Sequence, residues 1–286
     1  MKLKLTAILL LIFVLAGISV TLFIGSTLMA PAQQPIDSPA NVQNLQSVQF
    51  TSESGSTIHG WLMPGLADKG AVVLMHGVRA NRLSMLRRAQ FLNQNGFTVL
   101  LFDFQAHGES EGKHITFGYL ESRDAIASVN FVRAKFPGKK IGVLGVSMGG
   151  AAASLASPTL PVEAIVFEMV YPSIDRAVEN RLTMRLGNWA KIFSPLLLVQ
   201  LKWRLGLDPK VLRPIDRVPE IRVPKLFVVG SEDRHTTIGE SREFYNAAAN
   251  PKELWIVEGA AHVDLHQFQK DAYESHVLGF FNEHLR

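Results

Sequence analysis

The residue best placed for chemistry is a serine in the hexapeptide G-V-S-M-G-G at residues 145–150. A mostly apolar run precedes it and predicts a buried strand, and an alanine-rich run follows it and predicts a helix. A serine on the sharp turn between a strand and a helix holds its hydroxyl above the sheet, and glycines let that strained turn pack closely. The pattern predicts Ser147 as a nucleophile. A glycine-rich turn without chemistry is the alternative, because G-x-S-x-G arises by chance in roughly one chain in ten of this length.

Two later loops supply the acid and the base that a nucleophilic serine needs. The segment G-S-E-D ends at Asp233 and the segment G-A-A-H ends at His262, and each directly follows a predicted strand. Such loops meet at the carboxyl ends of the strands in an open α/β sheet. We expect His262 to take the Ser147 proton and Asp233 to hold the imidazole in one tautomer. Glu168, at the end of another predicted strand, is the rival acid, and Asp233 as a turn or capping residue is the structural alternative.

A third loop, H-G-V-R-A-N at residues 76–81, is expected to help bind the oxyanion that forms during attack. The backbone amides of Val78 and Met148 are the predicted donors. The loop residues expected to support this geometry are His76, Gly77 and Asn81. His76 as a second base is the alternative to a bracing role.

The composition argues against metals and redox chemistry. The chain has no cysteine, which excludes disulfides, thiol nucleophiles and cysteine-ligated metals. His262 and His266 stand four residues apart, but no third ligand follows at the spacing of a zinc protease motif. We therefore expect no metal and no cofactor. The net charge of +4 is too small to argue for a nucleic-acid partner.

Strand-like and helix-like segments alternate along most of the chain. The predicted strands lie at residues 45–50, 57–63, 71–75, 97–102, 140–146, 164–167, 225–229 and 253–257. Helical patterns separate the strands from the third onward, and the first two strands predict an antiparallel hairpin. We expect an α/β fold with a mostly parallel eight-stranded sheet covered by helices on both faces. Residues 171–218 contain helical patterns without strands and predict a short cap.

Together these motifs resemble the α/β-hydrolase fold family, serine hydrolases with a Ser-Asp-His triad. The matching patterns are H-G-x-x-x-N at 76–81, D-x-x-x-H-G-x-S at 103–110, G-x-S-x-G-G at 145–150, and G-x-x-D at 230–233. The resemblance covers about residues 45–286. The membrane-anchored members, which have an amino-terminal helix and a short cap, are most similar. One departure follows Asp233, where this chain reads R-H-T-T and relatives often carry a proline.

The amino terminus predicts export from the cytoplasm. Residues 5–30 are uncharged and apolar, and these 26 residues are enough to span a bilayer as a helix. The two lysines before them favour a cytoplasmic amino terminus with the rest outside. A signal peptide cleaved near A-P-A at 30–32 is the alternative, and would give a secreted or periplasmic protein. Prolines at residues 31–44 predict a linker, so a domain without residues 1–32 would fold and stay active.

The function expected from these features is a serine hydrolase that cleaves carboxylic esters through an acyl-enzyme. The same triad would serve an acyltransferase, a thioesterase or a peptidase, and a catalytically silent scaffold is the alternative of a different class. The substrate would be a small-molecule or lipid ester. Residues 172–217 carry nine basic and four acidic residues, so the cap either is solvated or rests on anionic headgroups. The acyl and alcohol groups and the oligomeric state stay open.

Overall fold

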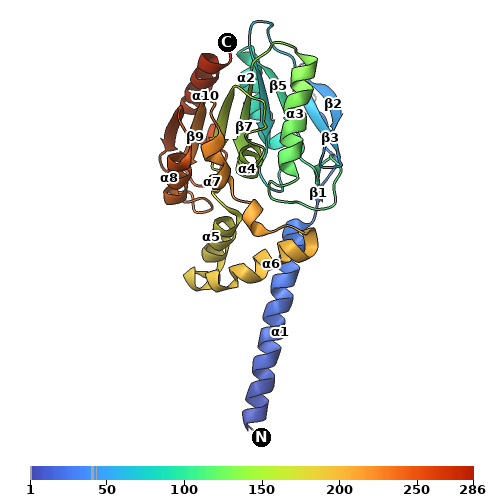
Figure 1. Ribbon diagram of the computed structural model, residues 1–286, viewed down its shortest axis with the longest axis vertical. Helices are drawn as coiled ribbons and strands as arrows, with labels where there is room; N and C mark the ends of the chain where they lie inside the picture. The colour runs from blue at the N-terminus through green and yellow to red at the C-terminus, as the bar shows by residue number, and fades with distance from the viewer. Residues whose placement is uncertain (1, 40–41, 43) are drawn as a thin grey trace.

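The structure is a computed structural model that describes all of the chain except residues 1, 40–41 and 43. Some side chains of the first helix are also outside the described set. An eight-stranded sheet has the order β10-β9-β8-β7-β4-β5-β3-β2 (Figure 1). The strands are β2 (Gln46–Thr51), β3 (Thr57–Met63), β4 (Ala71–Met75), β5 (Thr98–Phe102), β7 (Ile141–Val146), β8 (Ala164–Glu168), β9 (Lys225–Gly230) and β10 (Lys252–Val257).

The sheet is mostly parallel. β2 pairs with β3, and β3 with β5, in antiparallel register, whereas the other five pairings are parallel. Every residue of β4, β5, β8 and β9 is buried, as expected for strands covered on both faces. The α/β-hydrolase fold, the hairpin and all eight predicted strands are thereby confirmed. The carboxyl ends of β4, β7, β9 and β10 lie at one edge, where the predicted site loops begin.

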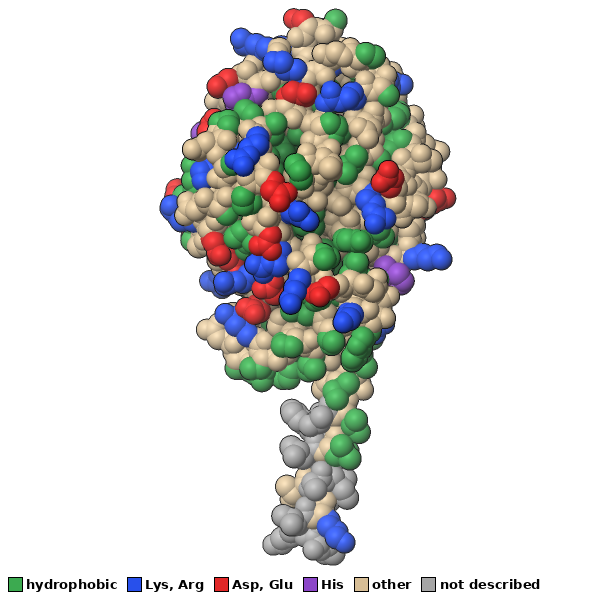
Figure 2. Space-filling view, viewed as in Figure 1, with side chains coloured by type: hydrophobic (Ala, Val, Ile, Leu, Met, Phe, Trp, Pro, Cys, Tyr) green, Lys and Arg blue, Asp and Glu red, His purple; other side chains and the backbone are tan. Residues whose placement is uncertain are grey.

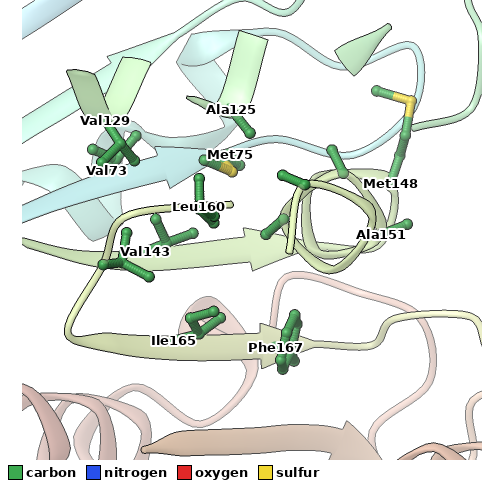
Figure 3. Packing of buried hydrophobic residues seen from close by; sticks show 14 of the residues in the cluster. Val73, Met75, Ala125, Val129, Val143, Met148, Ala151, Leu160, Ile165 and Phe167 are labelled. Atoms are coloured by element: carbon green, nitrogen blue, oxygen red, sulfur yellow. The ribbon is translucent and has the colours of Figure 1, made fainter. Parts of the chain in front are cut away.

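Helices cover both faces of the sheet because alternate strand residues point to opposite sides. One core contains Val73 and Val143 with side chains from α3 (Glu121–Lys135), α4 (Met148–Leu155) and α8 (Ile238–Ala247) (Figure 3). The other contains Val72 and Leu74 with side chains from α2 (Leu86–Gln94) and α10 (Lys270–His284). The last helix, predicted as one element, is divided, because a separate short helix α9 (Leu265–Phe268) precedes α10.

The segment between β8 and β9, all of which the structure describes, is helical and has no strand. Its elements are α5 (Ile174–Leu186), η2 (Asn188–Phe193), α6 (Ser194–Leu205), η3 (Pro209–Val211), α7 (Pro214–Arg217) and η4 (Val218–Glu220). Gly206, at φ +68°, ends α6 in the left-handed conformation that glycine adopts most easily. α5 and α6 lie beyond the carboxyl edge of the sheet (Figure 1).

The first helix, α1 (Lys2–Met29), projects from the body below the cap (Figure 1). Among the residues whose side chains are described, no helix is both long and apolar enough to cross a membrane. This finding does not support the predicted span, part of which falls on residues outside the described set.

The predicted linker needs correction. β1 (Ala32–Gln33) forms a two-residue parallel pair with β6 (His107–Gly108), and Ile36 is buried in the core. The last turns of α1 also contact the body: Met29 is buried, and its carbonyl accepts a hydrogen bond from Ile115 N at 2.9 Å. Ala32, Gln33 and Ile36 of the expected linker therefore pack on the domain, whereas residues 40–41 and 43 of that linker lie outside the described residues.

Candidate active site

Ser147 occupies a strained turn between β7 and α4. Its backbone angles are φ +51° and ψ −112°, a conformation that is costly for a residue with a side chain and that persists only where the surroundings enforce it. Its amide donates to Glu168 O at 2.8 Å. A Cβ on Gly149 would lie 2.3 Å from Met75 O, and one on Gly145 would lie 2.5 Å from Gly150 N. The glycines are therefore required for the close packing of helix on strand.

Asp233 and His262 form a direct pair. His262 Nδ1 lies 2.7 Å from Asp233 Oδ2, and the other carboxylate oxygen accepts hydrogen bonds from the backbone amides of His235 (2.7 Å) and Thr236 (2.9 Å). Both oxygens of the Asp233 carboxylate thus accept hydrogen bonds. Its contact with Nδ1 requires the His262 proton to be on Nδ1, so Nε2 carries no proton and can act as a base. Among the described side chains, no hydrogen bond joins Ser147 to His262; such contacts often tighten only when substrate binds.

Glu168, the rival acid, is committed to another interaction. Its carboxylate is fully buried, pairs with Arg88 Nη2 at 2.6 Å and accepts a hydrogen bond from the Tyr273 hydroxyl at 2.7 Å. A buried carboxylate with these partners neutralises a buried guanidinium. Glu168 is thus paired with Arg88, and the carboxylate in contact with His262 is that of Asp233.

His76 braces the loop that follows β4. Its Nδ1 donates to Gly77 O at 2.7 Å and its Nε2 accepts from Phe104 N at 3.1 Å, so both ring nitrogens are used. Burial, with a smaller contribution from His107, lowers the pKa of His76 to about 3. His76 is therefore neutral at physiological pH, and its geometry argues against the alternative of a second base.

Two backbone amides lie near Ser147, one from this loop and one from α4. Asn81 Oδ1 accepts from Leu83 N at 3.0 Å and caps the short helix η1 (Arg82–Met85). A Cβ on Gly77 would lie 3.6 Å from Ser147 Cβ, so the following residue, Val78, starts beside the nucleophile. Met148 is the first residue of α4, where N–H groups have no acceptor within the helix. Amides in these two places are suited to bind an oxyanion.

Sequence reasoning missed the surroundings of His262. The ring of His235 stacks on that of His262, with centroids 4.9 Å apart. From the cap helix α5, Asn180 Nδ2 donates to His235 O at 3.2 Å and to Glu240 Oε2 at 2.7 Å. Burial and the neighbouring His262 lower the pKa of His235. The only signal in the sequence was the R-H-T-T departure after Asp233, which did not indicate a stacked ring.

The buried His76 predicts a loss of stability in acid. The unfolded chain takes up a proton near the ordinary histidine pKa of about 6.5, whereas the folded chain resists until about pH 3, so the free energy of unfolding falls as the pH drops through that window. His76→Gln should reduce this dependence, measured as the midpoint of urea unfolding between pH 7 and pH 4. The control His114→Gln, at an exposed loop position, should keep the wild-type dependence. Equal pH dependence in His76→Gln and wild type would contradict the prediction.

Comparison with known proteins identifies the family to which this chain belongs. Residues 67–210, about half of the chain, match the family model of serine aminopeptidases of group S33, a hydrolase family, and the chain belongs to that family. The matched stretch contains the 76–81 loop and Ser147 and ends before Asp233 and His262. The protein is accordingly a hydrolase with the α/β-hydrolase fold.

Individual relatives match most of the chain at low identity. The uncharacterized protein YqkD of Bacillus subtilis is 25% identical over 237 residues, covering 81% of this chain and 77% of its own. Monoglyceride lipase of Rattus norvegicus is 25% identical over 274 residues, covering 82% and 89%. Among solved structures, the Pyrococcus furiosus esterase PF2001 superposes with a TM-score of 0.71 at 25% identity, covering 90% of this chain and 99% of the esterase.

Proposed function

We propose that this protein is a serine hydrolase that cleaves carboxylic esters through an acyl-enzyme on Ser147. The observation that carries the proposal is the 2.7 Å contact of His262 Nδ1 with Asp233 Oδ2, at the edge of the sheet where the strained Ser147 turn lies. The strain holds the nucleophile in place, and the carboxylate orients the base. An ester substrate is supported by the named activities of two relatives, an esterase and a monoglyceride lipase.

The proposed reaction has two halves. His262 Nε2 takes the proton from Ser147 Oγ as that oxygen attacks the ester carbonyl carbon, and the amides of Val78 and Met148 stabilise the oxyanion. The tetrahedral intermediate collapses, the C–O bond breaks, and the alcohol leaves with the proton from His262. Water, deprotonated by His262, then attacks the acyl-enzyme and releases the acid and the free serine. Asp233 stabilises the imidazolium in both halves. No cofactor enters these steps.

The exposed apolar side chains of the cap support the proposal that the substrate is apolar. Its outer surface exposes Trp189, Ile192 and Trp203 by 61%, 70% and 71%, and hydrophobic side chains gather at the end of the body where α1 emerges (Figure 2). Exposed aromatic and aliphatic side chains in such numbers mark contact with apolar matter. This feature favours a lipid-derived ester over a peptide.

Two alternative reactions, transfer of the acyl group to an alcohol and cleavage of a thioester, would use the same residues. A catalytically silent scaffold would instead show no acyl-enzyme on Ser147.

The cellular location proposed is outside the cytoplasm, and the charge pattern of the first 30 residues supports it. Two lysines precede the apolar run and no acidic residue interrupts it.

We infer that this run stays on the mature protein, because the carbonyls of Thr27 and Ala30 both accept hydrogen bonds from the Arg79 side chain (2.9 and 3.1 Å). Cleavage at the predicted signal site would remove that contact. Mass spectrometry of the protein purified from an exporting host tests this inference.

The ester hydrolase proposal is tested with a fluorophosphonate probe and p-nitrophenyl esters. The full-length protein should be labelled at Ser147, identified by peptide mass, and should hydrolyse p-nitrophenyl acetate and butyrate. Labelling without hydrolysis of esters or thioesters would point to acyl transfer or peptide cleavage. Absence of labelling would indicate the silent scaffold and would overturn the proposal.

A further inference from the structure

The cavity next to the proposed oxyanion site has one wall made by the amino-terminal helix. Its volume is about 100 Å³, and most of its lining is apolar. α1 contributes Leu28 and Met29 and α6 contributes Leu198 and Leu201, while Arg79 and Arg181 are the charged residues of the lining. Val78, whose amide we assign to the oxyanion, also lines it. The cavity therefore reaches the proposed oxyanion loop at Val78 and extends between the cap and α1.

α1 is fastened to the cap helix α6 at a point of close approach. A Cβ on Gly25 would lie 2.3 Å from Gln200 Oε1, so the two helices are in close contact here and a larger residue would displace the Gln200 side chain. Gln200 Nε2 donates to Thr21 O at 2.9 Å, and Arg204 Nη2 donates to Leu22 O at 3.1 Å. Met29 is buried in a cluster with Ile174, Leu201 and Leu212. These contacts fix the α1 wall relative to α6.

α1 is also fastened to the loop that carries Val78. Arg79, the next residue, has φ +58°, donates from its amide to His107 Nε2 at 3.0 Å, and extends its guanidinium to the end of α1. Nη1 of Arg79 contacts the carbonyls of Thr27 (2.9 Å) and Ala30 (3.1 Å). A cation is well placed at a helix carboxyl end, where free carbonyls gather. The same side chain therefore joins the oxyanion loop to the cavity wall.

We propose that this cavity holds the acyl chain of the substrate and that Leu28 and its neighbours on α1 set the chain length that fits. The inference rests on the proposed function, because it needs the acyl-enzyme on Ser147. The ligand is a hydrocarbon chain, since most of the lining is apolar, with Arg79 and Arg181 as its charged residues, and the chain of an acyl-enzyme would leave the Ser147 ester past Val78. The amino-terminal helix is thus a specificity element of the enzyme.

The test fills the cavity from two sides in the full-length protein. Leu28→Trp acts from α1 and Leu198→Trp from α6, and kcat/KM is measured on p-nitrophenyl acetate, butyrate and octanoate. Each methylene that loses its buried place costs a factor of about 4, so the octanoate-to-acetate ratio should fall at least about tenfold in both variants. Phe23→Trp is the matched control on α1, because Phe23 is 73% exposed and lies outside the cavity lining. Its ratio should equal that of wild type.

A second readout is independent of catalysis. Octanoate should bind to the Ser147→Ala protein in isothermal titration calorimetry, and binding should be lost in Ser147→Ala combined with either Leu28→Trp or Leu198→Trp but kept with Phe23→Trp. Melting temperatures identify any variant that fails to fold, and the other filling variant then decides. An unchanged octanoate-to-acetate ratio, or no octanoate binding by Ser147→Ala, would overturn this inference. Failure of wild type to hydrolyse any ester or take up the probe would overturn the proposed function instead.

Discussion

Replacing Ser147 with alanine should abolish ester hydrolysis while the protein stays folded. Loss of the nucleophile of a triad lowers kcat by about 10⁴- to 10⁶-fold, and only transition-state binding by the oxyanion donors remains. The substitution keeps Cβ, so the turn at φ +51° retains its packing against Gly77. We expect an unchanged melting temperature and no turnover of p-nitrophenyl butyrate above the rate in buffer.

The matched control for this change is Ser122→Ala on α3, a serine outside the proposed triad whose hydroxyl donates to Tyr119 O at 2.7 Å. It should keep both wild-type turnover and fluorophosphonate labelling. Turnover at the wild-type rate in Ser147→Ala would rule out the whole catalytic assignment, because alanine has no hydroxyl and the reaction would then not depend on a nucleophile at position 147.

Asp233→Asn should cost roughly 10⁴-fold in kcat, with little change in stability. An asparagine would present its amide group to His262 Nδ1 and favour the imidazole tautomer whose proton is on Nε2, which cannot accept the serine proton. The backbone amides of His235 and Thr236 would still find an oxygen, so the loop should keep its shape. The rate is measured on p-nitrophenyl butyrate across pH 6–9, and the fold is checked by thermal unfolding.

Glu168→Gln is the contrasting change. It removes the fully buried partner of Arg88 and leaves the guanidinium with Asp264, a partly exposed carboxylate 2.9 Å from Nη2, so the free energy of unfolding should fall by about 1–3 kcal/mol. The folded fraction should retain most of the wild-type kcat. If Glu168→Gln instead lowered kcat more than Asp233→Asn, the acid of the triad would follow β8, and the assignment of Asp233 would be wrong.

The sequence by itself determined the features that depend on short stretches of chain. The central strands were readable because a parallel strand buried on both faces must be a continuous apolar run, and their ends are marked by glycines and polar residues. The Ser147 turn was readable for the same reason, because strand, glycines and small helix residues lie within a dozen positions. The chain order Ser147, Asp233, His262 then followed from the rule that site loops share one edge of the sheet.

Only the tertiary structure decided how distant residues combine. Asp233 and Glu168 are both carboxylates at strand ends, and what separates them is that Arg88, far away in sequence, pairs with Glu168 while His262 faces Asp233. Likewise, an apolar amino-terminal run reads the same whether it will face lipid or a cavity, because hydrophobicity has no direction. The hydrogen bonds of Arg79 and Gln200 to the last turns of α1 are what make that run a wall of the proposed substrate site.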